Sequence, residues 1–174
     1  MKRFLFKRCL ILFLGLGSAF LLTHCAKEGK SPESASAPNF TVKTLDGHEI
    51  TLSQLKGKVI LLDFWATWCA PCRESIPHLV QLQKTYREKG LEVIGMNMDK
   101  GDLDTVRRFV KSMDVPYLIT VSTDEISRNY GVTGLPTTIL IDKAGKIRQK
   151  FLGFSSEISK EMTATLADLT TEKL

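Results

Sequence analysis

The stretch of sequence that decides the fold is FWATWCAPCR, at residues 64–73. It places Cys69 and Cys72 directly after an apolar run at residues 59–64. A run that is apolar on both faces is typical of a central strand covered on both sides, as in a parallel α/β sheet. Residues 72–89 predict a helix that ends at Gly90 and is kinked at Pro77. The cysteine pair therefore lies between a buried strand and a helix N-terminus.

This position favours redox chemistry, because the free N–H groups and the dipole of a helix N-terminus stabilise a thiolate. We expect Cys69 to be the attacking thiolate and Cys72 to resolve the mixed disulfide. Pro71 suits the first turn, where no backbone N–H is needed. A purely structural disulfide would close too short a loop to stabilise much. A zinc site would need further ligands, and neither His48 nor His78 has ligand spacing. We expect no metal, and no cofactor beyond the redox-active pair.

The first 24 residues predict a targeting segment: residues 1–8 are basic, and residues 9–22 form an uncharged apolar run, as in a secretory signal. Residues 22–25 (LTHC) resemble a bacterial lipobox in which Cys25 would carry lipid, although His24 replaces the usual small residue. The alternatives are an uncleaved membrane anchor and, third, release as a soluble protein. The first two predict a membrane-tethered protein at the periplasmic or extracytoplasmic face.

Residues 25–38 are small, polar and rich in Ser and Pro, which predicts a flexible tether before a domain at 39–174. Four basic residues at positions 2–8 supply most of the net charge of +5. The rest of the chain carries 20 Lys and Arg against 19 Asp and Glu. A domain so close to neutral lacks the electrostatic footprint of a nucleic-acid-binding protein, so we expect no nucleic-acid partner.

The remaining pattern is that of a mixed α/β domain. Short strands around an Asp-Gly turn predict an N-terminal β-hairpin over residues 39–52. Periodicity and capping residues predict further strands at 91–98, 117–121, 137–142 and 147–152, and helices at 103–113, 124–130 and 155–169. Strands that alternate with helices before a closing hairpin and helix predict one domain, with a central mixed β-sheet flanked by helices.

The segment around Cys69 resembles the active site of the thioredoxin superfamily. Residues 38–142 resemble its TlpA/ResA-like branch of membrane-tethered thiol-disulfide oxidoreductases, with an N-terminal region similar to AhpC/TSA and Redoxin proteins. The matching motifs are LDG-x4-L-x2-LKGK at 45–58, Pro77 five residues after Cys72, and GLPTT at 134–138.

The resemblance implies a single thioredoxin-like domain in which Pro136 is cis. It also implies that Leu135 presents its backbone to a substrate peptide beside the attacking cysteine. Trp68, Ala70 and Pro71 are expected to contact the same substrate.

Asp63 is the one acidic residue of the apolar run, six residues before Cys69. A buried carboxylate is costly unless it is paired or protonated, so we expect its pKa to be raised. It resembles the buried acid of thioredoxin, which implies that Asp63 acts as a general base toward Cys72. The alternative is an aspartate at the solvent-exposed edge of the strand.

The chain departs from its branch at Ser75, where many relatives carry a glutamate three residues after the second cysteine. Glu74, one position earlier, points about 100° away on a helix. The role of that glutamate therefore does not carry over, which leaves equivalence with the cytochrome-maturation members open. We expect His78 to lie outside the catalytic machinery and Trp65 to lie in the core.

These observations predict an extracytoplasmic dithiol–disulfide oxidoreductase that reduces protein disulfides, with cytochrome c maturation as one setting. The resemblance also implies a membrane thiol-relay protein as electron donor. The first alternative is a dithiol oxidase or isomerase. A peroxiredoxin-like peroxidase would need Thr or Ser at the position of Ala66. A non-catalytic thioredoxin-fold binding module would not need both cysteines.

Overall fold

The computed structural model describes residues 35–173, so the predicted targeting segment and Cys25 lie outside the described residues. The fold is built on a five-stranded mixed sheet with the order β5-β4-β3-β6-β7. Its strands are β3 (Val59–Trp65), β4 (Leu91–Asn97), β5 (Leu118–Val121), β6 (Thr137–Ile141) and β7 (Ile147–Leu152). β3, β4 and β5 are parallel, whereas β6 and β7 each run antiparallel to the preceding neighbour in the sheet. The predicted mixed sheet is confirmed.

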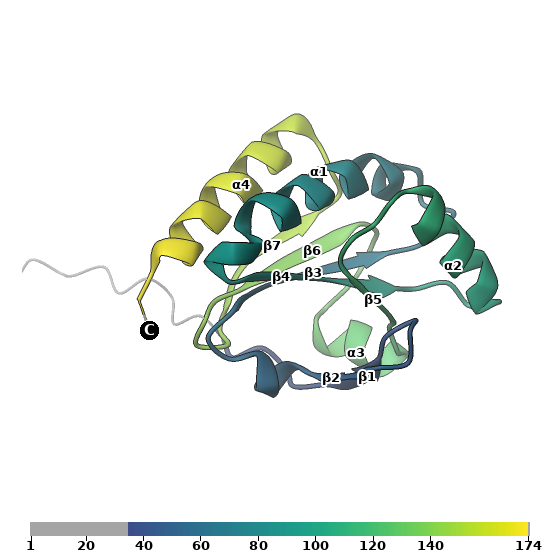
Figure 1. The fold of residues 1–174 in the computed structure, drawn as a ribbon, viewed down its shortest axis with the longest axis horizontal. Helices are drawn as coiled ribbons and strands as arrows, with labels where there is room; N and C mark the ends of the chain where they lie inside the picture. Colours follow the sequence, from purple (N-terminus) through teal and green to yellow (C-terminus); the bar gives the residue numbers. More distant parts are fainter. Residues whose placement is uncertain (1–34, 174) are drawn as a thin grey trace, which may run out of the picture. The chain divides into compact units, whose positions relative to one another are not determined.

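Helices and a small hairpin cover the two faces of this sheet (Figure 1). One face carries α1 (Ala70–Tyr86), α4 (Ser156–Thr171) and, beside the β5 edge, α2 (Leu103–Ser112). The other face carries α3 (Asp124–Asn129) and the hairpin β1 (Thr41–Lys43) with β2 (Glu49–Thr51). Two short 3-10 turns complete the chain: η1 (Leu52–Leu55) and η2 (Arg87–Lys89). No helix within residues 35–173 has the length and apolarity needed to cross a membrane.

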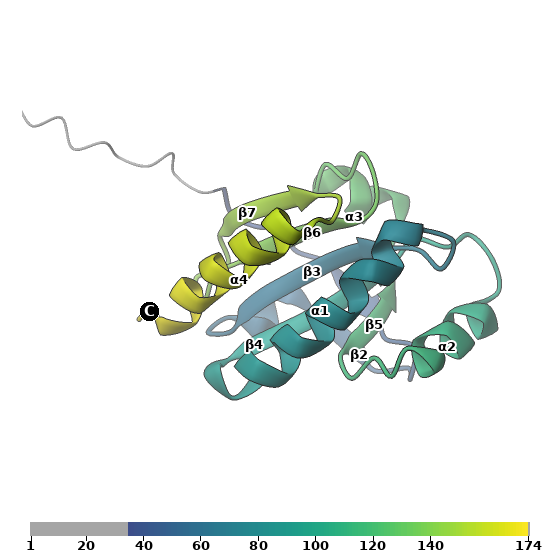
Figure 2. The same ribbon diagram turned by 90° about the horizontal axis from the view of Figure 1, so that it is seen from above.

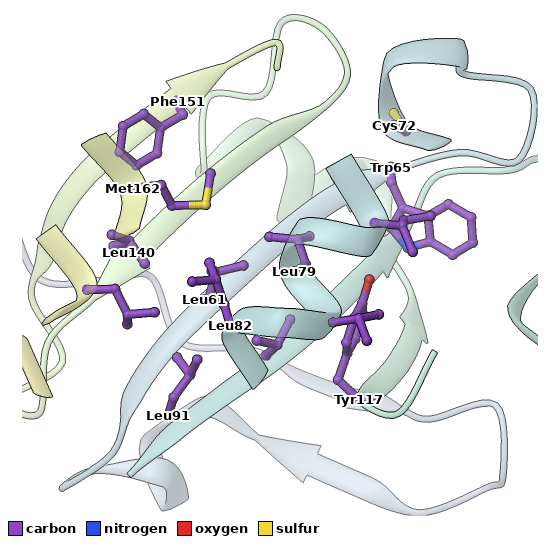
Figure 3. Close-up of a cluster of buried hydrophobic side chains, with 14 of the residues drawn as sticks. Leu61, Trp65, Cys72, Leu79, Leu82, Leu91, Tyr117, Leu140, Phe151 and Met162 are labelled. Carbon is purple, nitrogen blue, oxygen red and sulfur yellow. The ribbon is translucent and has the colours of Figure 1, made fainter. Parts of the chain in front are cut away.

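The central strand β3 is buried along its whole length and divides the core in two. Because side chains alternate across a strand, Leu61 and Trp65 enter the core under α1 and α4, whereas Leu62 and Phe64 face the hairpin and α3. Figure 3 shows the first cluster, in which side chains of the sheet meet those of α1 and α4. Asp63 shares the side of Leu61 and Trp65 and is thereby directed toward the layer that carries the cysteines.

Capping residues at the helix ends agree with the predicted helix starts near residues 103 and 155 and with the predicted end at Gly90. Ser155 caps α4 by accepting the N–H of Ile158, and Asp102 caps α2 by accepting the N–H of Asp104. Gly90 ends η2 with a φ of 89°, a left-handed conformation that glycine adopts without steric cost.

The chain becomes part of the fold before residue 39. The N–H of Ala37 donates to the carbonyl of Gly145 at 2.9 Å, and the N–H of Ile147 donates to that of Ala35 at 2.9 Å. The described chain therefore starts beside the turn between β6 and β7.

Gln83 joins α1 to β4 through a buried hydrogen bond. Its Oε1 accepts the N–H of Val93 at 2.8 Å, one residue before the pairing of β4 with β5 begins at Ile94. We expect Gln83→Leu to lower the free energy of unfolding by about 1–3 kcal/mol, because it leaves a buried N–H without an acceptor.

Urea unfolding measures this effect, and Gln81→Leu is the matched control. Gln81 is exposed on the same helix, and its replacement should change stability by less than about 0.5 kcal/mol. Equal losses in the two variants would show that the bond to Val93 contributes nothing.

Candidate active site

Cys69 and Cys72 form a disulfide, with an S–S distance of 2.05 Å, at the N-terminus of α1. Cys69 is the N-cap residue, and its Sγ accepts the N–H of Cys72 at 3.3 Å. Cys72 is fully buried, whereas 5% of the surface of Cys69 is exposed to solvent. An incoming sulfur can therefore reach Cys69 first, and the N–H of the helix start points at the sulfur that would carry negative charge.

The loop before β6 lies at the same end of the sheet. Thr137 pairs with Phe64 near the end of β3, so the preceding Leu135 and Pro136 lie beside the segment that carries the cysteines. The Leu135–Pro136 peptide bond is cis, as predicted. Leu135 packs against the core cluster that contains both cysteines. Trp68 is 68% exposed, and Ala70 and Pro71 are exposed as well, so all three are available to a substrate.

The sequence reasoning missed a second exposed apolar residue at this end, Leu152. It lies at the end of β7, pairs with Thr137, and is 57% exposed. Its Cδ1 lies over Gly134, where an added Cβ would approach it to 3.3 Å. The neighbouring N–H of Gly153 donates to the carbonyl of Pro136 at 2.8 Å. Leu152 therefore extends the apolar rim of the site, and only the strand pairing reveals it.

Asp63 is completely buried in the middle of β3, which excludes the alternative of a solvent-edge aspartate. Its Oδ1 accepts the hydroxyl of Thr138 at 3.2 Å, while Oδ2 has no partner among the described residues. Burial raises the pKa of Asp63 to about 7, although the bond from Thr138 opposes the shift. This direction agrees with the predicted rise, and a pKa near 7 would let Asp63 accept or release a proton near neutral pH.

Gly95 has no side chain, which leaves room for large side chains beside Asp63. It pairs with Asp63 across the sheet, and a Cβ there would lie 2.9 Å from Nε1 of Trp65 and 2.5 Å from Cδ1 of Ile119. Tyr117 packs in the same region, and burial, followed by the nearby Asp63 carboxylate, raises its phenol pKa well above the usual value. Trp65, Ile119 and Tyr117 thus pack over Gly95, beside the fully buried Asp63.

A clamp that the sequence reasoning missed holds the loop before Cys69. Asp99 accepts the N–H of Thr67 at 2.8 Å and its hydroxyl at 2.6 Å, and also the side-chain amide of Asn97 at 2.7 Å. Arg73 donates through Nε and Nη2 to the carbonyl of Thr67, at 3.0 and 2.7 Å. Partial burial alone would raise the pKa of Asp99, but the bonds from Thr67 and Asn97 outweigh it and lower the pKa.

We expect Asp99→Ala to slow disulfide exchange by up to about 100-fold, because small misplacements of reacting groups cost rate steeply. The loss of charge-assisted bonds should also lower the free energy of unfolding by about 2 kcal/mol. Stopped-flow exchange and urea unfolding measure the two effects. Thr67→Val keeps the backbone hydrogen bond to Asp99, so its exchange rate and its free energy of unfolding should fall much less. An undiminished exchange rate in Asp99→Ala would show that the clamp is irrelevant to the chemistry.

The remaining candidates lie outside this centre. Ser75 is buried and donates its hydroxyl to the carbonyl of Cys72 at 2.9 Å, while Glu74 is exposed, so no carboxylate occupies that buried place. His78 lies on α1 and faces α4, with its Nδ1 3.4 Å from the hydroxyl of Ser159. Burial lowers the pKa of His78, which favours its neutral form. Among residues 35–173, no three His, Cys, Asp or Glu side chains are grouped so as to hold a metal.

Known proteins share both the sequence and this geometry. The Redoxin family model matches residues 32–166. "Thiol-disulfide oxidoreductase ResA" of Bacillus cereus (strain ATCC 10987 / NRS 248) is 40% identical over 155 residues, which cover 87% of this chain and 89% of that protein. "Thioredoxin-like protein YneN" of Bacillus subtilis (strain 168) is 36% identical over 169 residues, covering 95% and 98%. A solved structure of a putative thiol:disulfide interchange protein DsbE from Chlorobium tepidum superposes with a TM-score of 0.74 at 31% identity, covering 79% of this chain and 96% of that one.

Proposed function

The chain belongs to the Redoxin family and is a thioredoxin-like thiol-disulfide oxidoreductase, and we propose that it reduces protein disulfides on the extracytoplasmic side of a membrane. Its substrates are proteins that contain disulfides. Membrane attachment through a lipid on Cys25 or through an uncleaved anchor is part of the proposal, as is a membrane thiol-relay protein that supplies electrons. Apocytochrome c is one candidate substrate. The pair of cysteines needs no further cofactor.

In the proposed cycle, the Cys69 thiolate attacks a substrate disulfide and forms a mixed disulfide, and one substrate sulfur leaves as a thiolate. Asp63 then takes the proton of the Cys72 thiol. The Cys72 thiolate attacks Sγ of Cys69, which forms the Cys69–Cys72 disulfide and releases the second substrate thiolate. Two electrons have passed to the substrate, and the dithiol must be restored by the electron donor.

The observation that carries the reducing direction is the sparse support for a thiolate at Cys69. Among the described residues, the one hydrogen bond to its Sγ comes from the N–H of Cys72. The nearby cation of Arg73 is engaged by the carbonyl of Thr67 and by the ring of Phe109, 5.8 Å away. A strongly stabilised thiolate favours the reduced form and makes a strong oxidant, so weak stabilisation favours a reductant.

Equilibrium titration of the Cys69–Cys72 pair against a thiol buffer tests this proposal. We expect a reduction potential near that of thioredoxin, about −270 mV. A value near that of strong oxidants, about −120 mV, would make the protein a donor of disulfides.

A further inference from the structure

The end of the sheet opposite Cys69 is formed by four segments that touch one another. The N–H of Gly57 donates to the carbonyl of Lys143 at 2.9 Å, and the N–H of Val59 donates to that of Gly90 at 2.9 Å. Lys143 reaches the end of α4, where its Nζ donates to the carbonyls of Thr170 and Glu172. We call this surface, made of residues 56–58, 87–92, 142–148 and 172–173, the basic pole. In Figure 2 the C-terminal ends of α1 and α4 and the start of β7 lie together on the left, away from the N-terminal ends of both helices.

The charge of the domain is concentrated at this pole. Residues 35–173 carry 18 Lys and Arg against 17 Asp and Glu, which is nearly neutral. The basic pole holds eight of these basic residues and only four of the acidic ones, a net charge of +4. The rest of the described domain, including the active-site end, therefore has a net charge of −3. The sum over the chain conceals this separation.

Most acidic residues of the basic pole form salt bridges with basic residues of the same pole. Arg148 bonds Glu172 at 2.8 Å and Asp142 at 3.3 Å, and Lys58 bonds Glu92 at 2.8 Å. By contrast, Lys56, Arg87, Lys89 and Lys146 form no salt bridge with any residue of the described range. The first three are exposed and Lys146 is half-buried, so the unpaired cations face outward.

The basic pole is also where the described chain begins. Residues 35 and 37 hydrogen-bond to Ile147 and Gly145 of this surface. From Cys25 to residue 35 the chain can span at most roughly 35 Å, at about 3.3–3.6 Å per residue. Any attachment at or before Cys25 therefore connects to the described domain at this pole.

A hollow in the same surface favours lipid over other polyanions. A cavity of about 250 Å³ lies between the segment 36–39 and the loop that carries Lys56 and Lys58. Its lining includes Leu52, Leu55 and Ile60, so apolar walls adjoin the two cations. Phospholipids present a phosphate next to apolar chains, whereas nucleic acids and free phosphate offer no apolar part.

We propose that the basic pole docks on the headgroups of an anionic phospholipid surface and turns Cys69 toward the aqueous side. This inference rests on the membrane attachment proposed above. β3 has seven residues and runs from the basic pole toward Cys69, so the reactive sulfur lies roughly 20 Å or more from the lipid, at about 3.3 Å per residue. The electron donor must then present its thiols on a part that projects from the membrane.

Amine footprinting of the full-length chain on preformed vesicles tests the docking. Acetylation of individual lysines is followed by mass spectrometry, on phosphatidylglycerol vesicles and on phosphatidylcholine vesicles. Each basic residue near an anionic surface gains about 1 kcal/mol, which corresponds to roughly a fivefold preference. We therefore expect Lys56, Lys89 and Lys146 to react about fivefold more slowly on phosphatidylglycerol only. High salt should abolish the difference.

Lys43 and Lys160, exposed and outside the basic pole, serve as internal controls and should react equally on both vesicles. In the triple variant Lys56→Gln/Lys89→Gln/Lys146→Gln, the exposed amines that remain in the basic pole, those of Lys58 and Lys173, should show no protection on phosphatidylglycerol. The matched variant Lys43→Gln/Lys160→Gln should keep it. Both variants should exchange disulfides at the unaltered rate, because none of the changed residues belongs to the catalytic or substrate-contacting residues described above.

The outcomes separate docking from attachment. If the protein sediments with both kinds of vesicle but its lysines react equally on both, it is attached to the membrane without docking. This result would overturn the docking inference but not the proposed attachment. Chain that sediments with neither, and is unprotected, overturns both. Protection of the same lysines by inorganic phosphate or by RNA, at the level seen with phosphatidylglycerol, would also overturn the assignment to a membrane.

Discussion

Replacing Cys69 by serine should abolish disulfide exchange, and replacing Cys72 by serine should stop the reaction one step later. A serine hydroxyl at position 69 is neither ionised near neutral pH nor able to form the mixed disulfide. In Cys72→Ser, Cys69 should still attack the substrate through the small part of its surface that is exposed, but the fully buried resolving thiol is gone. We expect turnover to be lost in both variants and a covalent complex with substrate to accumulate only in Cys72→Ser.

Non-reducing electrophoresis followed by mass spectrometry detects that complex and identifies the trapped protein. A set of trapped clients would show whether the substrates include apocytochrome c. The double variant Cys69→Ser/Cys72→Ser controls for capture through Cys9 and Cys25, which remain in all three chains. Full turnover by Cys72→Ser would contradict the dithiol mechanism and favour a binding module.

The central part of the site could be predicted because its signals are local in sequence. The two cysteines, the proline between them and the helix that follows occupy one short stretch, and the physics of a helix N-terminus assigns their roles. Asp63 is conspicuous as the one acid in an apolar run, and its complete burial and raised pKa agree with that reading. The predicted cis bond before Pro136 came from family resemblance, since few X-Pro bonds are cis without it.

The parts that could not be predicted depend on contacts between distant segments. Asp99 lies 32 residues from Thr67, and nothing in the sequence around either residue links them. In the sequence, Leu152 looks like an ordinary strand residue. Only its pairing with Thr137 shows that it lies beside the loop that contains Pro136. The basic pole was hidden because a net charge is a sum, whereas docking depends on where the loops bring charges together. All three features arise from contacts that the topology of the fold creates between distant segments.

Replacing Asp63 by asparagine should stabilise the oxidised protein at neutral and alkaline pH. The folded-state pKa of Asp63 is about 7, above the ordinary aspartate value of 3.8. Between these values the unfolded chain loses its proton while the folded chain keeps it, so stability falls as pH rises and levels off above about 7. Three pH units correspond to about 4 kcal/mol, which is an upper bound on the gain in Asp63→Asn at pH 8.

Urea unfolding of both chains at pH 4, 6 and 8 gives this difference, in which contributions of other groups cancel. It should be near zero at pH 4 and grow with pH. Asp46→Asn is a control of opposite sign: Asp46 is exposed, and the hydroxyl of Thr44 lowers its pKa, so its replacement should not stabilise the protein at high pH. A difference for Asp63→Asn that does not change with pH would refute the raised pKa.

The same substitution should slow the chemistry, because asparagine cannot accept the proton of Cys72. We expect the resolving step in single-turnover experiments to fall by about 100-fold, the lower end of what general bases contribute. In the wild-type chain this step should accelerate as pH rises through about 7, where Asp63 ionises, and in Asp63→Asn that acceleration should disappear. A variant that is more stable and equally fast would show that Asp63 is not the base. A more stable and slower variant would mean that this fold retains a buried carboxylate, at a cost to its stability, because its reaction requires one.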